Sequence, residues 1–90
     1  MIRQPDSDED AATLALRALV WTLAEPERAQ RLLALTGVDP RDRRARIGDP
    51  AVLAASLQFL LANEADLIAC AAGLNVSPAA LARAAGELDA

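Results

Sequence analysis

The sequence predicts an all-α protein: a compact single-domain bundle of five or six short helices, with a central apolar helix near residues 50–62. Three observations support this prediction. Four potential capping residues are followed directly by proline, glycines stand where helices would end, and alanine and leucine make up 37 of the 90 residues. No stretch alternates apolar and polar residues as a half-buried strand does, and β-branched residues are few.

Proline and glycine set most of the expected helix boundaries. Four helix starts share a capping residue followed by proline at the first helical position. They are Glu25-Pro26, Asp39-Pro40, Asp49-Pro50 and Ser77-Pro78. Three glycines are placed to end helices in a left-handed turn, namely Gly37, Gly48 and Gly73. The expected helices span about 8–24, 26–36, 40–47, 50–62, 64–72 and 78–88.

Two boundaries rest on other signals. The start of the first helix near residue 8 is inferred from Ser7 and Asp10, which have the spacing of a capping box. Asn63 marks the weakest break, so residues 50–72 form either two helices or one bent helix. Residues 1–7 are expected to be an acidic, flexible tail that precedes a single helical domain at residues 8–90.

The helix at 50–62 is expected to lie at the centre, because Ser56 and Gln58 are its only polar side chains between Ala51 and Ala62. Its alanines would allow a neighbouring helix to approach closely; they are Ala51, Ala54, Ala55 and Ala62. The last helix has a thinner apolar stripe, formed by Leu81, Ala84, Ala85 and Leu88.

The first helix carries apolar residues on more than one face. The stripe expected to be buried consists of Ala12, Leu16, Leu19, Val20 and Leu23. Leu14 and Trp21 fall on nearly the opposite side, beside Arg17. Two interpretations stay open: either the helix is buried on both faces between two neighbours, or Leu14 and Trp21 form an exposed apolar patch for self-association or a partner helix.

The composition excludes most familiar catalytic chemistry. The chain has no His, Lys or Tyr, which excludes Ser-His-Asp and Cys-His catalysis, imidazole metal sites and Schiff bases. Its one cysteine, Cys70, can form neither an internal disulfide nor a thiolate zinc site, and we expect it to be a buried, inert thiol. We therefore predict no cofactor, no metal site and no enzymatic activity.

The net charge of −4 conceals a basic middle segment. Residues 28–46 contain six arginines and two acids, whereas the segments on both sides are acidic. Four of the arginines form a cluster that suits carboxylate or phosphate binding: Arg41, Arg43, Arg44 and Arg46. The cluster surrounds a short helix and has no aromatic neighbour. Two interpretations stay open: the arginines pair with the chain's own acidic side chains, or they bind an anionic partner.

A nucleic-acid-binding function is the alternative that this basic segment suggests. Residues 67–87 also have the small residue, glycine and apolar residue of a degenerate helix-turn-helix. Its second helix, however, offers only Arg83 against Glu87, which is a poor surface for phosphates or base edges. The acidic net charge also opposes this function, so nucleic acid is not the favoured partner.

Several fragments of the sequence together resemble one family. They are Ala-Leu-Arg-Ala-Leu at 15–19, Trp21, Leu-Ala-Leu-Thr-Gly-Val-Asp-Pro at 33–40, Gly-Asp-Pro at 48–50, Phe-Leu-Leu-Ala-Asn-Glu at 59–64 and the closing Ala-Gly-Leu-Asn-Val-Ser-Pro. The chain after Asp10 thereby resembles the small uncharacterised alpha-proteobacterial proteins catalogued as domain of unknown function 3572. The resemblance implies a compact helical protein from a GC-rich bacterium and brings no catalytic residues.

The favoured function is a small cytoplasmic helical module for protein interaction or regulation, without catalytic activity. Its partner would be an unidentified protein or a second copy of the chain in a homodimer. The acidic N-terminus is unlike a secretory signal peptide. The longest uncharged run, residues 50–63, is too short and too rich in alanine to cross a bilayer, so no membrane partner is expected.

Overall fold

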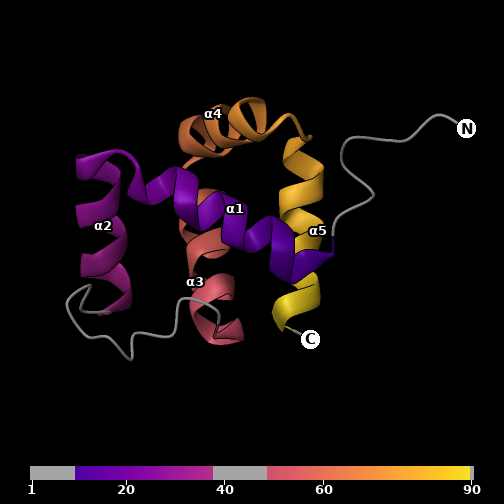
Figure 1. Ribbon diagram of the computed structural model, residues 1–90, viewed down its shortest axis with the longest axis horizontal. Helices are drawn as coiled ribbons and strands as arrows, with labels where there is room; N and C mark the ends of the chain where they lie inside the picture. Colours follow the sequence, from indigo (N-terminus) through magenta and orange to yellow (C-terminus); the bar gives the residue numbers. More distant parts are fainter. Residues whose placement is uncertain (1–9, 38–48, 90) are drawn as a thin grey trace, which may run out of the picture.

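Five helices make up the part of the chain that the computed structural model describes, residues 10–37 and 49–89 (Figure 1). They are α1 (Ala11–Leu23), α2 (Pro26–Thr36), α3 (Pro50–Leu61), α4 (Glu64–Leu74) and α5 (Pro78–Asp89). The described ranges contain no strand, which confirms the predicted all-α class. The predicted helix at 40–47, the tail at 1–7 and Gly48 lie outside the described residues.

Three of the predicted caps begin helices, the fourth (Asp39) lies outside the described residues, and Asn63 caps a further helix. Glu25 caps α2 with a carboxylate oxygen that accepts from the backbone N–H groups of Glu27 and Arg28, at 2.8 and 3.2 Å. Asp49 and Ser77 accept in the same way from the first turns of α3 and α5. Asn63 caps α4, and the axes of α3 and α4 differ by 115° across it. Residues 50–72 therefore form two helices.

Helix α1 begins later than predicted. Asp10 is itself the N-cap, because its Oδ1 accepts from the Thr13 backbone N–H at 2.8 Å and its Oδ2 accepts from the Thr13 hydroxyl at 3.2 Å. The expected start near residue 8, with Asp10 as the last member of a capping box, is wrong. A carboxylate that satisfies two donors of the first turn and meets the positive end of the helix dipole sets the boundary at Ala11.

Asp10 also makes the stability of α1 depend on pH. The hydrogen bonds from Thr13 hold the pKa of this carboxyl below its ordinary value. Its stabilising effect is therefore present above the pKa of the unfolded chain and is lost as pH falls through the lower pKa of the folded state. We expect the wild type to melt at a higher temperature than Asp10→Asn at pH 7, with the difference fading below about pH 4. A difference that stays constant down to pH 2 in thermal melts would contradict this assignment.

Of the glycines predicted to end helices, the structure confirms one and shows that another lies inside its helix. Gly37 ends α2 with a left-handed φ of 72°, as predicted. Gly73 does not end α4, because the helix continues to Leu74 and Asn75 takes the left-handed conformation instead, with φ of 61°. The Val76 backbone N–H then donates to the Ala71 carbonyl at 2.9 Å, which completes a Schellman turn. Gly73 is needed for a different reason, its contact with Trp21.

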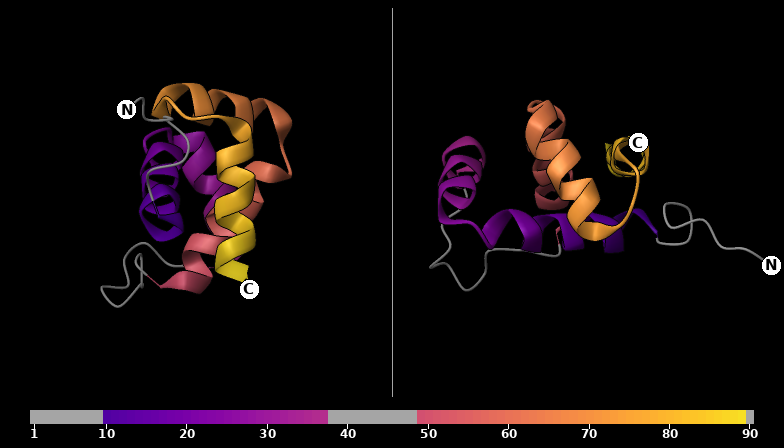
Figure 2. Two further views of the ribbon diagram at one scale, coloured as in Figure 1. Left: turned by 90° about the vertical axis from the view of Figure 1, so that its right-hand side faces the viewer. Right: turned by 90° about the horizontal axis from the view of Figure 1, so that it is seen from above.

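The core lies where α1, α3 and α5 pack together. Figures 1 and 2 show α2, α3 and α5 side by side, with α1 lying across them and α4 across one end of the bundle. Helix α3 contacts each of the other four described helices, which confirms its predicted central place, and α1 does the same. Leucines at the centre are fully buried, notably Leu57, Leu60 and Leu81. Of the alanine face of α3, Ala54 is buried whereas Ala51 and Ala62 are exposed.

The buried face of α1 differs largely from the stripe that the sequence predicted to be buried, and it includes Leu14. Leu14, Ala15, Ala18, Leu19 and Thr22 are buried. The predicted stripe holds only for Leu19, because Leu16, Val20 and Leu23 are 40, 60 and 37% exposed. Alanine at 15 and 18 lets the backbone of α1 approach the helices beneath it, so the small-residue face packs and the bulkier aliphatic face remains outside.

No single helix in the described ranges is long and apolar enough to cross a membrane; α3 and α4 pass that test only as a pair, across their bend.

Candidate functional site

An aliphatic strip runs along the outer face of α1. It consists of Leu16, Val20 and Leu23, spaced four and three residues apart, so the side chains follow one another on one face of the helix. Val20 is the most exposed of the three, at 60%. Aliphatic side chains at this spacing are what a helix presents to a second helix. We call these three residues the α1 strip.

A surface hollow adjoins the α1 strip. It has a volume of about 410 Å³ and is lined by Leu16, Arg17, Val20, Trp21 and Leu74. It lies between α1 and the C-terminal end of α4, and we call it the α1–α4 hollow. Four of its five lining residues are apolar, and Arg17 supplies the charge at its edge. The hollow can therefore accept apolar side chains from outside while a cation stands next to them.

Trp21 is held in the wall of the hollow by close contacts. A Cβ placed on Gly73 would lie only 2.9 Å from Trp21 Nε1 and 3.2 Å from Cδ1, so only glycine fits beneath the indole. The Arg28 guanidinium lies 3.7 Å from the centroid of the indole, at cation–π distance. Arg28 Nη2 also donates to the Trp21 carbonyl at 3.0 Å. These contacts join α1, α2 and α4 around one side chain.

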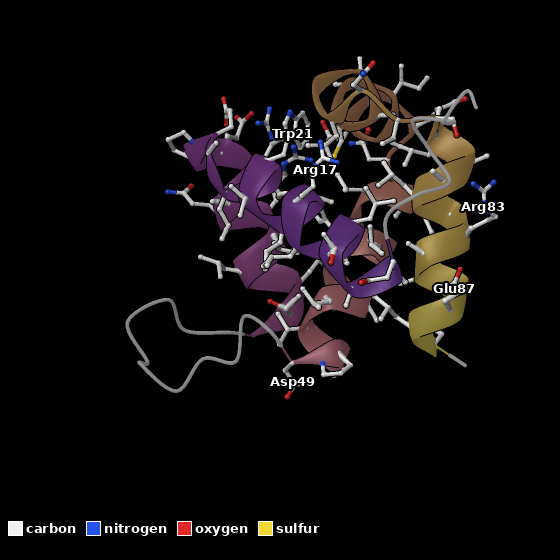
Figure 3. The ribbon with its side chains drawn as sticks, turned by 45° about the vertical axis from the view of Figure 1, so that its right-hand side comes forward. Arg17, Trp21, Asp49, Arg83 and Glu87 are labelled. Atoms are coloured by element: carbon white, nitrogen blue, oxygen red, sulfur yellow. The ribbon has the colours of Figure 1, made fainter. Side chains whose placement is uncertain are left out.

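Arg17, which also lines the hollow, joins α1 to the end of α4. Its Nη2 donates to the Leu74 carbonyl at 2.8 Å, at the C-terminal end of α4. A cation at this end of a helix satisfies an unpaired carbonyl and meets the negative end of the helix dipole. Figure 3 shows Arg17 and Trp21 close together, whereas Arg83 and Glu87 project from α5 away from them. Arg17 therefore lines the hollow, whereas Arg28 packs on Trp21 and is not part of the lining.

A second, larger hollow lies between the C-terminal end of α2 and α3. Its volume is about 560 Å³, and no charged residue lines it. Its lining consists of Leu35, Thr36, Ala51, Val52, Ala55, Gln58, Phe59 and Ala62. Leu35 at its edge is 72% exposed. This groove has no charged group to orient a ligand, and Thr36 and Gln58 are its only polar lining residues, so we regard the α1–α4 hollow as the candidate site.

Cys70 lies beneath this region and carries no reactive chemistry. Its side chain is fully buried, which confirms the prediction, and the thiol is free. Burial raises the pKa of the thiol to about 11, even though Arg28 and Arg17 act in the opposite direction. The thiol is therefore protonated at neutral pH, the form that does not act as a nucleophile. Among the described residues no group of three acidic, cysteine or histidine side chains could hold a metal ion.

The two residues of the predicted apolar patch are separated by the structure. Leu14 is 3% exposed and belongs to the core, so it is not available to a partner. Trp21 is partly buried and lines the hollow. The residues that accompany Trp21 are Leu16, Val20 and Leu74, which sequence reasoning missed. The spacing of Leu16 and Val20 on one face was visible, but it was interpreted as a buried stripe.

The predicted arginine cluster, comprising Arg41, Arg43, Arg44 and Arg46, lies outside the described residues. Arg31, by contrast, forms an ion pair with Asp66 at 3.1 Å. The degenerate helix-turn-helix corresponds to α4 and α5, and α5 begins at Pro78 as predicted. The exposed side chains of Arg83 and Glu87 on α5 carry opposite charges.

Comparison with known proteins gives one result. No curated protein and no solved structure matches the chain. The model of the family described as "Protein of unknown function (DUF3572)" matches residues 8–90. Since this match covers nearly the whole chain, the protein belongs to the DUF3572 family, as its sequence resemblance implied.

Proposed function

We propose that this chain is a small protein-interaction module without catalytic activity, which docks a helix of a partner protein on the α1 strip and in the α1–α4 hollow. One observation carries the proposal: three exposed aliphatic residues at helical spacing adjoin a hollow walled by the only tryptophan of the chain. Tryptophan and arginine are the residues most enriched among those that dominate binding energy at interfaces. Here both occur beside an apolar strip.

The geometry suits a helix as the docked element. An amphipathic helix binds by laying aliphatic residues spaced three and four apart into an apolar groove. The α1 strip offers matching contacts over two helical turns, from Leu16 to Leu23.

We also propose the cytoplasm as the compartment, since a single cysteine with a free, buried thiol is typical of reducing surroundings. The nucleic-acid alternative stays a prediction.

Substitution of Val20 by glutamine tests the docking surface. Val20 is 60% exposed, so Val20→Gln is expected to leave the fold unchanged while placing a polar amide in the centre of the strip. Partners that copurify with the tagged wild type are identified by mass spectrometry, and their affinity is then measured with purified proteins by calorimetry. We expect the affinity of Val20→Gln to be at least about tenfold lower than that of the wild type.

Ile68→Gln is the matched control. Ile68 is 53% exposed on α4 and lines neither hollow, so the same substitution there is expected to leave the affinity unchanged. The mass of the free protein in solution is measured in parallel, because it shows whether the bound partner is a second copy of the chain. Equal affinities for the wild type and Val20→Gln would show that the docking surface lies elsewhere.

A further inference from the structure

The exposed face of α1 carries no charged side chain. Its exposed residues are Ala12, Thr13, Leu16, Val20 and Leu23. Helix α5, which also lies at the surface, exposes Arg83, Glu87 and Asp89. Three of the five large apolar side chains that are exposed in the ranges 10–37 and 49–89 belong to the α1 strip. A solvated helix face ordinarily carries charged side chains, so this uncharged aliphatic face indicates a surface that a partner covers.

The α1 strip is itself the kind of element that the α1–α4 hollow accepts. The function proposed above requires a docked helix with aliphatic residues three and four positions apart. Leu16, Val20 and Leu23 of α1 have this spacing and are exposed. The strip and the hollow lie side by side on the same helix and share Leu16 and Val20. One chain therefore presents both halves of a helix–helix contact on a single surface.

The distribution of charge favours contact between two identical surfaces of this kind. Two molecules of net charge −4 repel each other, and the repulsion is least where the facing surfaces are uncharged. Arg17, the charged residue in the lining of the hollow, already donates to the Leu74 carbonyl at 2.8 Å. The hollow therefore requires no opposite charge from its partner, and an identical uncharged surface can cover it.

We propose that the partner is a second copy of this chain, and that two copies form a two-fold symmetric dimer in which their α1 helices pack antiparallel. This inference rests on the function proposed above and names the partner. Val20 lies at the centre of the α1 strip, so it faces its counterpart near the two-fold axis, and Leu16 of each copy faces Leu23 of the other. Because both copies use the same surface, the assembly closes at two. Figure 2 shows α2, α3 and α5 on one side of α1, so these helices leave the approach open.

The small size of the contact makes the dimer weak. Helix α1 has 13 residues and is about 20 Å long at 1.5 Å per residue. Its exposed face and the hollow supply far fewer than the roughly 20–30 residues a side of a standard interface. Interfaces below the standard size are typically transient. The dimer is therefore expected to be in exchange with the monomer and to depend on protein concentration.

Sedimentation equilibrium of the full chain tests the dimer. Protein concentrations from about 1 μM to 1 mM cover the dissociation constants of a weak interface. We expect the mass to rise from 9.4 kDa to twice that value and no further. Val20→Gln is expected to raise the dissociation constant at least about tenfold, and Ile68→Gln on α4 is expected to leave it unchanged. Because the contact is uncharged, added salt is expected to leave the dimer equally stable or to stabilise it. Circular dichroism confirms that each variant is folded.

A disulfide across the two-fold axis tests the geometry. The one native cysteine, Cys70, is fully buried, so Val20→Cys introduces the only exposed thiol. Two cysteines that face each other at the axis can bring their Cβ atoms within the roughly 3.5–4.5 Å that a disulfide requires. Under mild oxidation we expect Val20→Cys to form a cross-linked dimer on a nonreducing gel. Ile68→Cys is the matched control, because position 68 is similarly exposed but lies on α4, and it is expected to cross-link much more slowly.

The possible outcomes separate this inference from the docking proposal. A wild type that stays monomeric, while Val20→Gln weakens binding of a different protein, would leave the docking surface in place and overturn the second copy as its partner. A dimer that Val20→Gln does not weaken, or in which Val20→Cys cross-links no faster than Ile68→Cys, would overturn the inference because the interface would lie elsewhere. Growth beyond two copies would overturn the closed two-fold arrangement. If the wild type is monomeric and Val20→Gln changes the affinity of no partner, both proposals fail.

Discussion

Replacement of Leu14 by alanine is expected to lower the free energy of unfolding by about 2–4 kcal/mol. Leu14 is 3% exposed and belongs to the buried cluster that joins α1, α3 and α5. Truncation removes apolar surface from the core and leaves a cavity, because the neighbouring helices can only partly close the space. Urea denaturation followed by circular dichroism measures the change.

Leu16→Ala is the matched comparison, since the same substitution is made two residues away in the same helix. Leu16 is 40% exposed, so less apolar area is returned to water and no closed cavity forms. We expect a loss of less than about 1 kcal/mol. The reverse order, with Leu16→Ala the more damaging substitution, would mean that the α1 strip faces the core. In that case the surface on which the proposed function depends would not be exposed.

Gly73→Ala is expected to lower the free energy of unfolding by about 1–2 kcal/mol, the net of an overpacking cost and a gain in helix propensity. The added Cβ would lie 2.9 Å from Trp21 Nε1. The indole has little room to yield, because Arg28 covers it at 3.7 Å. A shift of the indole would also change the shape of the α1–α4 hollow. We therefore expect Trp21 emission to shift in the folded variant, together with the denaturation midpoint.

The same substitution at a second helical glycine, Gly86→Ala, is expected to stabilise the protein instead of destabilising it. A Cβ added at Gly86 meets nothing within 4 Å, so only the helix propensity changes. This variant is expected to be more stable than the wild type by about 0.5–1 kcal/mol, with unchanged Trp21 emission. If both glycine variants were stabilised equally, the close contact between Gly73 and Trp21 would be refuted.

Local signals in the sequence predicted most of the helix boundaries. A capping side chain followed by proline acts on the backbone within one turn, so Glu25, Asp49 and Ser77 could be recognised without any tertiary information. Gly37 was recognised for the same reason, as the left-handed end of α2. Gly73 has the same residue type, but its role depends on a side chain 52 positions earlier in the chain. Residue type alone does not distinguish these two uses of glycine.

The candidate site was only partly predictable. Trp21 was singled out as unusual, and it lines the hollow. Leu14 was grouped with it by helical spacing, although it lies in the core. In α1 the leucines occupy several faces, so hydrophobic periodicity cannot identify the face that packs inward. That choice depends on how closely α3 and α5 approach the alanines at 15 and 18, which is a property of neighbouring helices.

By itself the sequence determined the all-helical class, most of the starts and ends of the helices, the central place of α3 and the absence of histidine and lysine chemistry. Those features follow from residue types and from interactions within one or two turns. Only the tertiary structure decided which side of α1 is exposed, that Gly73 contacts the indole of Trp21, and that Arg28 stacks on the same indole. Each of these depends on contacts between helices that lie apart in the chain, because burial is a property of the packed neighbours and not of a residue's own helix.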